Sequence, residues 1–127
     1  AKASMIVAEA SYEVTDPTVD SQIVTLKGSG ADVLFTIATP KFAAQAIRKV
    51  ADLGWKPLHY LNNVASSVGA VLTPAGLDKS VGLITALYMK DPTDPQWSKD
   101  PGMQRWREFM AKYMPGADAN DFNHVYG

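Results

Sequence analysis

The sequence predicts an α/β fold, in which an open parallel β-sheet carries helices on both faces and so forms three layers. Short runs of strand-forming residues alternate with amphipathic helical runs, and the connections between them are short. Such alternation requires right-handed crossovers between parallel strands. The chain has 127 residues, 46% hydrophobic and 20% charged, which suits one globular domain. Residues 1–127 are therefore predicted to form a single lobe.

The first strand and helix come early in the chain. Residues 5–8 are a short apolar run, which predicts a strand. Residues 15–18, with the sequence Thr-Asp-Pro-Thr, supply capping side chains for the start of a helix. A turn with Gly28 and Gly30 ends that helix. The apolar stripe of the helix recurs at i, i+4 and i+7 and consists of Val19, Ile23 and Leu26.

The second strand and helix have the clearest pattern. Residues 32–38 are nearly all apolar, as expected of a parallel strand that is covered on both faces. Thr39 and Pro40 then place a capping residue before a proline at the first helical position. The helix is predicted to end at Gly54. Its apolar face carries Ala43, Ala46, Ile47, Val50 and Leu53.

Two further strands complete the predicted sheet. Residues 57–61 form the third strand, which leads into a polar corner at Asn62 and Asn63 and a weak helical stretch toward Leu72. Residues 81–88 form the fourth strand. The sequence therefore predicts a sheet of four parallel strands.

The C-terminal part of the chain has a different residue pattern. Residues 89–102 are rich in proline and aspartate and predict an irregular connection that is ordered against the surface. A helix is predicted over residues 102–114, with Asp100 and Pro101 at its start and Pro115 at its end. Its predicted buried face carries Met103, Trp106, Met110 and Tyr113.

The composition excludes several classes of function. Lys and Arg number 12 and Asp and Glu number 13, so the sequence indicates no basic surface for nucleic acid. The absence of cysteine excludes disulfides, thiol nucleophiles and thiolate metal sites. The phosphate-loop, serine-elbow and zinc-helix motifs are absent, and His59 and His124 have no acidic or histidine partner at metal-ligand spacing. We therefore expect no enzyme, no metal and no cofactor.

The carboxyl ends of the predicted strands mark the candidate binding site. In open parallel sheets ligands bind at that edge, because helix N-termini and loop amides converge there. The residues at these ends are Tyr12 and Glu13 after the first strand, Ala38 and Thr39 after the second, Asn62 and Asn63 after the third, and Met89 and Lys90 after the fourth. The candidate ligand contacts among them are Ala38, Thr39, Asn62 and Asn63. Thr39 is also explained by helix capping, and the two asparagines by a turn. With no carboxylate pair and no Ser–His pair, the edge suits binding better than catalysis.

Two long segments resemble a known family. Residues 16–35 are similar to the second lobe of the leucine/isoleucine/valine-binding proteins, the periplasmic solute receptors of branched-chain amino acid ABC transporters. Residues 43–57 resemble the next helix and turn of that lobe, and residues 125–127 resemble the start of the helix that returns to the hinge. The order and spacing of these segments extend the resemblance over nearly the whole chain.

The resemblance implies a type I periplasmic binding fold, in which two α/β lobes enclose the ligand. The chain would then be part of the second lobe, truncated at both ends, in a periplasmic or extracytoplasmic receptor that delivers a small solute to an ABC transporter permease. The ligand contacts would come from Ala38, Thr39 and Asn62. Amino-acid-binding members place an acidic residue at the position of Asn62 to pair with the ammonium. Because an amide cannot supply that charge, the resemblance favours an aliphatic or aromatic carboxylate over an amino acid.

Two other functions are compatible with the predicted α/β fold. A ligand-sensing lobe of a receptor or transcription regulator would have this fold, and the full-length gene would distinguish it. A flavodoxin-like receiver domain has about this length, but it needs carboxylates where Thr39 and Asn62 stand. A truncated lobe would also leave backbone groups unpaired, so a homodimer that exchanges or adds strands is expected, with residues 122–127 as the exchanged arm.

Overall fold

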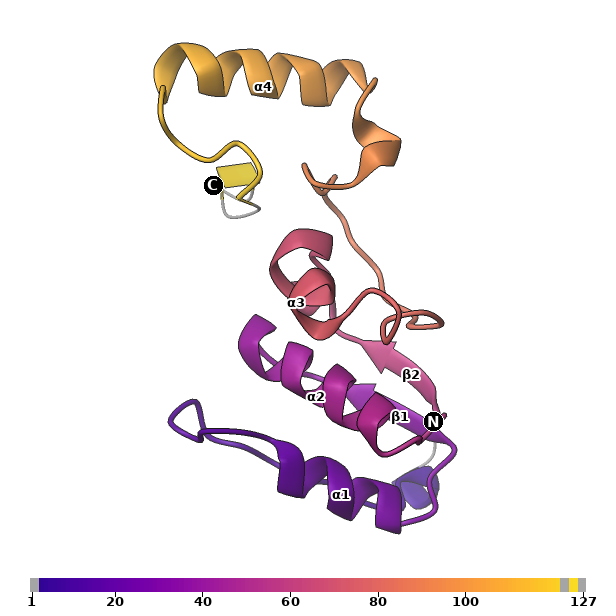
Figure 1. Ribbon diagram of the computed structural model, residues 1–127. Helices are drawn as coiled ribbons and strands as arrows, with labels where there is room; N and C mark the ends of the chain where they lie inside the picture. The colour runs from indigo at the N-terminus through magenta and orange to yellow at the C-terminus, as the bar shows by residue number, and fades with distance from the viewer. Residues whose placement is uncertain (1–2, 122–123, 126–127) are drawn as a thin grey trace.

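The computed structural model describes residues 3–121, 124 and 125, and builds an α/β body on a two-stranded parallel sheet (Figure 1). Strand β1 is Val33–Thr36 and strand β2 is Leu58–Leu61. The two pair in register along their whole length, from Val33 opposite Leu58 to Thr36 opposite Leu61. Helix α2, Pro40–Asp52, connects them, so the predicted βαβ unit at the centre of the chain is present.

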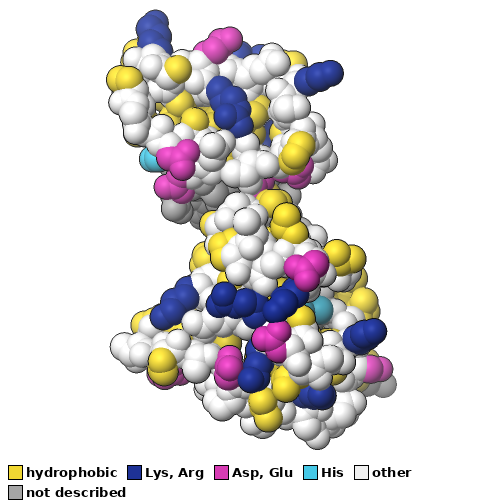
Figure 2. Space-filling model, in the orientation of Figure 1, with side chains coloured by type: hydrophobic (Ala, Val, Ile, Leu, Met, Phe, Trp, Pro, Cys, Tyr) yellow, Lys and Arg dark blue, Asp and Glu magenta, His cyan; other side chains and the backbone are white. Residues whose placement is uncertain are grey.

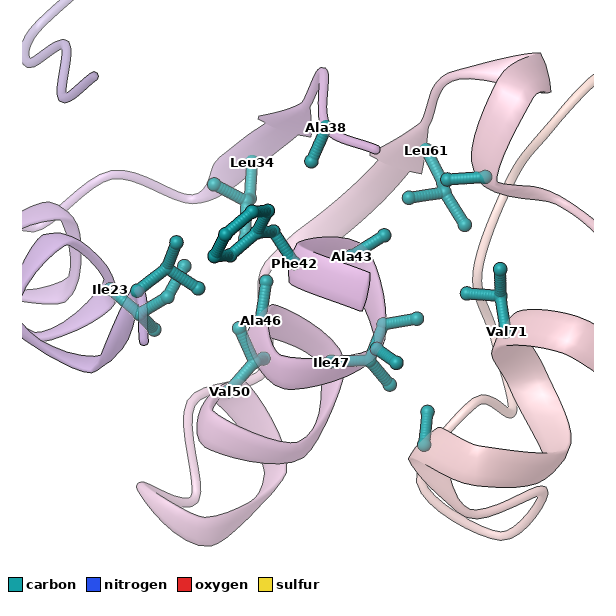
Figure 3. Packing of buried hydrophobic residues seen from close by; sticks show 14 residues of the cluster. Ile23, Leu34, Ala38, Phe42, Ala43, Ala46, Ile47, Val50, Leu61 and Val71 are labelled. Atoms are coloured by element: carbon teal, nitrogen blue, oxygen red, sulfur yellow. The ribbon is translucent and has the colours of Figure 1, made fainter. Parts of the chain in front are cut away.

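Helix α2 forms the centre of the core. Thr39 stands at its N-cap in extended conformation and Pro40 begins the helix, but the Thr39 side chain makes no capping hydrogen bond. Four residues of the predicted apolar face are buried, and Leu53 is partly buried. The buried face of α2 consists of Phe42, Ala43, Ala44, Ala46, Ile47 and Val50. These side chains meet Leu34 and Leu61 of the sheet and Ile23 and Val71 from the neighbouring elements (Figure 3).

Two elements flank α2. Helix α1, Asp20–Gly28, packs on one side of it through the buried Ile23. On the other side, a π-helical turn at Val68–Leu72 leads into the short helix α3, Thr73–Ala75, and contributes the fully buried Val71. The core therefore consists of three helical elements over one face of the sheet.

The prediction of four strands is wrong for the described residues, which form two. In place of the first strand, Ala3–Met5 is a 3-10 turn and residues 6–13 run on without regular structure. Residues 81–88 contribute a single bridge, between Ile84 and Tyr60. A strand forms only where a neighbour accepts its backbone hydrogen bonds. No described strand lies beside residues 6–8, and Gly82, at φ +89°, turns the chain just before the bridge.

The prediction of helices on both faces is also wrong for the described residues. Thr36 and His59 are buried on the side of α2, together with Leu34 and Leu61. The alternate residues face solvent, with Phe35 68% and Leu58 48% exposed. Since α1 and α2 both pack on the buried side, the described part of the chain has two layers. Of the apolar residues in 32–38, every second one is therefore buried and the others face solvent.

Helix α4, Pro101–Tyr113, lies away from the sheet at the far end of an irregular segment and forms a second mass in the space-filling view (Figures 1 and 2). As predicted, Asp100 caps it, accepting a hydrogen bond from the Met103 amide at 2.9 Å. Met103 and Met110 are buried as expected, whereas Tyr113 is 61% exposed. Of the predicted exchanged arm, residues 122, 123, 126 and 127 lie outside the described part.

Candidate functional site

The carboxyl ends of β1 and β2 bring three of the four predicted site residues together. The Asn62 amide donates to the Thr36 carbonyl at 3.0 Å, which continues the sheet beyond β2. The Ala38 amide donates to the Asn62 side-chain oxygen Oδ1 at 3.3 Å, and Thr39 follows directly. Asn63 begins a 3-10 turn at Asn63–Ala65, where it is exposed and makes no described hydrogen bond to the other three. The candidate site is therefore an edge formed by Ala38, Thr39 and Asn62.

The orientation of the Asn62 side-chain amide follows from its contact with Ala38. Its Oδ1 faces a backbone N–H of Ala38, and this contact identifies the oxygen, because two donors would repel each other. The Nδ2 group then points elsewhere with two N–H donors, and the described residues give it no partner. Asn62 is half-buried, so this amide group is held at the surface of the edge. Asn62 therefore presents hydrogen-bond donors and has its acceptor engaged.

Thr39 adds further donors beside Asn62. Its side chain is exposed and does not cap α2, so the first-turn amides of that helix receive no side-chain acceptor from Thr39. A helix N-terminus carries a partial positive charge that favours anions. The Thr39 amide itself donates to the Tyr12 hydroxyl at 2.9 Å. The edge as a whole therefore offers donors and no formal charge.

Tyr12 also lies at this edge, where the sequence placed it after the first predicted strand without counting it among the ligand contacts. Its ring packs against Phe42 of α2 with centroids 4.5 Å apart, and its hydroxyl receives the Thr39 amide. It lies in the unpaired segment of residues 6–13, so its position depends on the path of that segment. The signal in the sequence was its place after the apolar run of residues 5–8, although that run does not form a strand.

Behind the edge lies a buried polar pair that does not take part in it. His59 is 6% exposed, and its Nε2 lies 2.8 Å from the Thr36 hydroxyl Oγ1. Burial lowers the pKa of His59 to about 4, so the ring is neutral near pH 7. Enclosed between the sheet and α2, it has no open path to a solute. Its role is to satisfy the Thr36 hydroxyl inside the core.

The arrangement suits reversible binding. Catalysis by acid–base or nucleophilic steps needs a titratable group or an activated nucleophile at the edge, and Ala38, Thr39 and Asn62 supply neither. In the described part of the chain, no three His, Cys, Asp or Glu residues gather closely enough to hold a metal ion. The described fold is thus an α/β lobe with a polar, uncharged edge at the carboxyl ends of its two strands.

Comparison with known proteins places the chain in a family. A family model described as periplasmic binding protein matches residues 1–127, so the chain belongs to the periplasmic binding protein family, which includes the branched-chain amino acid binding proteins. Searches of curated proteins and of solved structures find no match. Members of this family are extracytoplasmic, bind small solutes, are generally non-enzymatic and usually work with a transporter. The prediction is confirmed at the level of the periplasmic binding protein family. The leucine/isoleucine/valine-binding subfamily and the second lobe stay predictions.

One further observation concerns membranes. No helix within the described residues has both the length and the apolar character needed to cross a bilayer.

Proposed function

We propose that this chain is the ligand-binding part of the second lobe of a periplasmic solute receptor. The receptor delivers a small carboxylate, or an amino-acid-like solute held by its carboxylate, to an ABC transporter permease. The observation that carries the proposal is the orientation of Asn62, whose acceptor is engaged by Ala38 and whose donors are free of partners among the described residues. The family assignment supports the general role of solute binding.

The donor character of the edge favours an anionic group. A ligand ammonium needs several acceptors, and one of the two lone pairs of the Asn62 oxygen is already occupied by the Ala38 amide. A carboxylate needs donors, and the edge offers Asn62 Nδ2, the Thr39 hydroxyl and the first amides of α2. Charge-assisted hydrogen bonds of this kind are among the stronger ones. The substrate class that fits best is therefore an aliphatic or aromatic carboxylate.

The test is an NMR titration of the 127-residue chain with two matched pairs, isovalerate against isobutylamine and benzoate against benzylamine. We expect the carboxylates to shift the Asn62 side-chain amide and the Thr39 backbone amide, and the amines to leave both unchanged. Equal responses to carboxylates and amines would contradict the proposal.

A charge substitution adds a second test of the same edge. Asn62→Glu places a like charge about 4 Å from a bound carboxylate, and a repulsion of about 1 kcal/mol in water weakens binding roughly fivefold. The matched control is Val64→Glu, which adds the same charge at a position two residues away that is 61% exposed. If Asn62→Glu binds carboxylates as tightly as Val64→Glu does, Asn62 is only a turn residue.

A further inference from the structure

A polar hollow lies between the start of α1 and the outward side of α2, and it offers about 260 Å³ of free volume. All six residues that line it are polar, and four of them recur on α2 at i, i+3, i+4 and i+7, which places them on one face of that helix. Figure 2 shows cationic and anionic side chains gathered on the part of the surface where α2 lies. The hollow is lined by Thr18, Asp20, Gln45, Arg48, Lys49 and Asp52.

Each of the two carboxylates of the hollow has a lysine as its counter-ion. Asp20 Oδ2 lies 3.2 Å from Lys49 Nζ, and Asp52 Oδ1 lies 2.7 Å from Lys79 Nζ. The Thr18 hydroxyl also donates a hydrogen bond to Asp20 Oδ1 at 2.8 Å. This hydrogen bond and the contact with Lys49 hold the pKa of Asp20 below its ordinary value, so Asp20 is ionised near pH 7. The acidic groups of the hollow are therefore charged and neutralised within the chain.

Arg48 is the cation of the hollow that has no acidic partner. It is exposed, and the described residues place no carboxylate within ion-pair distance of it. Its guanidinium makes one long hydrogen bond, in which Nη1 donates to the Pro74 carbonyl at 3.4 Å. The remaining N–H groups form a planar fork that matches the oxygens of a carboxylate or a phosphate. The hollow therefore carries an unneutralised positive group that suits an oxyanion.

Gln45 gives the same hollow an acceptor without a donor. Its Nε2 donates to the Pro17 carbonyl at 3.2 Å, and this contact identifies which end of the amide is the nitrogen. Its Oε1 is buried and, among the buried side-chain polar atoms of residues 3–121, 124 and 125, it is the one that has no hydrogen-bond partner. A buried acceptor without a partner lowers stability, and a donor that reaches it removes this cost. Gln45 therefore favours a ligand that brings an O–H or N–H group.

The two unmet requirements together select one class of ligand. Gln45 and Arg48 are three positions apart on α2, so their Cβ atoms lie about 5–6 Å apart and one small molecule can contact both side chains. An oxyanion without a hydrogen, such as acetate or sulfate, pairs with Arg48 but leaves Gln45 Oε1 without a donor. An amine supplies the donor but is repelled by the unpaired guanidinium. An oxyanion that carries its own hydroxyl meets both requirements.

We propose that this hollow binds a small hydroxylated oxyanion, such as a 2-hydroxy carboxylate or hydrogen phosphate. The charged oxygens accept hydrogen bonds from Arg48 and from the ammonium of Lys49, which has three donors and uses one on Asp20. The ligand hydroxyl donates to Gln45 Oε1. Because Oε1 is buried, the ligand displaces the side chains one turn further along α2, those of Arg48 and Lys49, which are long and flexible. The site uses no residue of the strand edge and does not depend on the proposed solute site.

The test is an NMR titration of the 127-residue chain at pH 7 and low ionic strength with two pairs of anions, glycolate against acetate and hydrogen phosphate against sulfate. Within a pair the two anions differ in whether they carry a hydroxyl. We expect the hydroxylated member to bind about five- to tenfold more tightly and to shift the Gln45 side-chain amide. The Asn62 side-chain amide reports the strand edge separately. The pair with the larger preference shows whether a carboxylate or a phosphate is the better source of the oxyanion.

Two variants separate the roles of the acceptor and the cation. Gln45→Met removes the acceptor at similar size, so glycolate and acetate should bind equally; its control, Gln22→Met, changes a glutamine whose Oε1 already accepts the Ser21 hydroxyl at 2.8 Å and should keep the preference. Arg48→Gln should weaken all four anions at this hollow by about tenfold. Its control is Arg105→Gln, at an exposed arginine of α4, which should leave binding unchanged.

The preference within a pair is a ratio of two affinities of the same variant, so a general loss of stability does not reproduce its disappearance. Circular dichroism checks that each variant is folded. Equal binding of the hydroxylated and plain members of both pairs by the parent chain overturns the proposal. A preference that survives Gln45→Met overturns it as well.

Discussion

Burial of a single histidine is expected to make the stability of this fold depend on pH. Burial lowers the pKa of His59 from 6.5 to about 4 in the folded state. Between these values the unfolded state binds more protons, so stability falls as the pH drops from about 6.5 toward 4. A shift of this size corresponds to about 3 kcal/mol. We expect urea unfolding to show this loss between pH 7 and pH 4.

Two substitutions separate burial from hydrogen bonding at this site. His59→Gln removes the titrating group and should flatten the pH dependence in that window. Thr36→Val removes the hydroxyl that lies 2.8 Å from Nε2 but keeps the ring buried, so the pH dependence persists. If His59→Gln retains the full loss of stability, burial of this ring is not its cause.

The residues of the candidate edge differ in how far the sequence could reveal them. Ala38 and Asn62 were predictable, because the carboxyl ends of adjacent parallel strands meet at one edge whatever the rest of the fold does. The engaged Oδ1 of Asn62 was not predictable, since it depends on a contact across the crossover with the Ala38 amide. Tyr12 was placed at this edge by the strand-end rule, although the strand predicted before it does not form. Its contacts with Phe42 and Thr39 depend on the path of the unpaired segment, which local sequence does not determine.

At the scale of elements, a buried aspartate fixes the irregular connection to the body. Asp91 is 2% exposed and accepts hydrogen bonds from the Val68 amide at 2.8 Å and from the amide and hydroxyl of Thr93. Asp91→Ala leaves the Val68 amide without its acceptor and should cost about 2 kcal/mol. Urea unfolding measures this loss, and hydrogen exchange at the Val68 amide shows local opening.

The control for this prediction is a second aspartate in the same connection. Asp94 accepts from the Gln96 amide at 3.0 Å and caps the 3-10 turn at Pro95–Trp97, without reaching the body. Asp94→Ala should cost about 0.5–1 kcal/mol, as loss of a cap does. Equal costs for the two variants would show that Asp91 does not anchor the connection.

The elements also show where local pattern determines structure and where it does not. The 3.6-residue periodicity of α2 and its Thr39–Pro40 start predicted its position closely, because a helix satisfies its own backbone. Strands need partners. Residues 32–38 and 57–61 pair with each other and form, whereas residues 5–8 have the right composition but no described neighbour. Strand propensity therefore predicted more strands than the described residues form.

The described residues leave several large apolar side chains exposed. Ile37 is 80% and Val81 84% exposed, in addition to the open face of the sheet. Large exposed apolar patches mark interaction surfaces.

The exposure of the candidate edge to solvent lowers the ligand affinity that we expect of the chain as a whole. Thr39 is exposed and Asn62 only half-buried, so a bound solute is contacted from one side. Tight small-molecule sites bury about 70–90% of the ligand surface, and a receptor that holds its ligand between two lobes supplies the second side from the other lobe. We therefore expect the 127-residue chain alone to bind small carboxylates in the millimolar range, about −4 kcal/mol. Calorimetric titration with amino acids and aromatic acids provides the measurement. Submicromolar binding of any of them would mean that one lobe alone encloses its ligand, which contradicts the open edge.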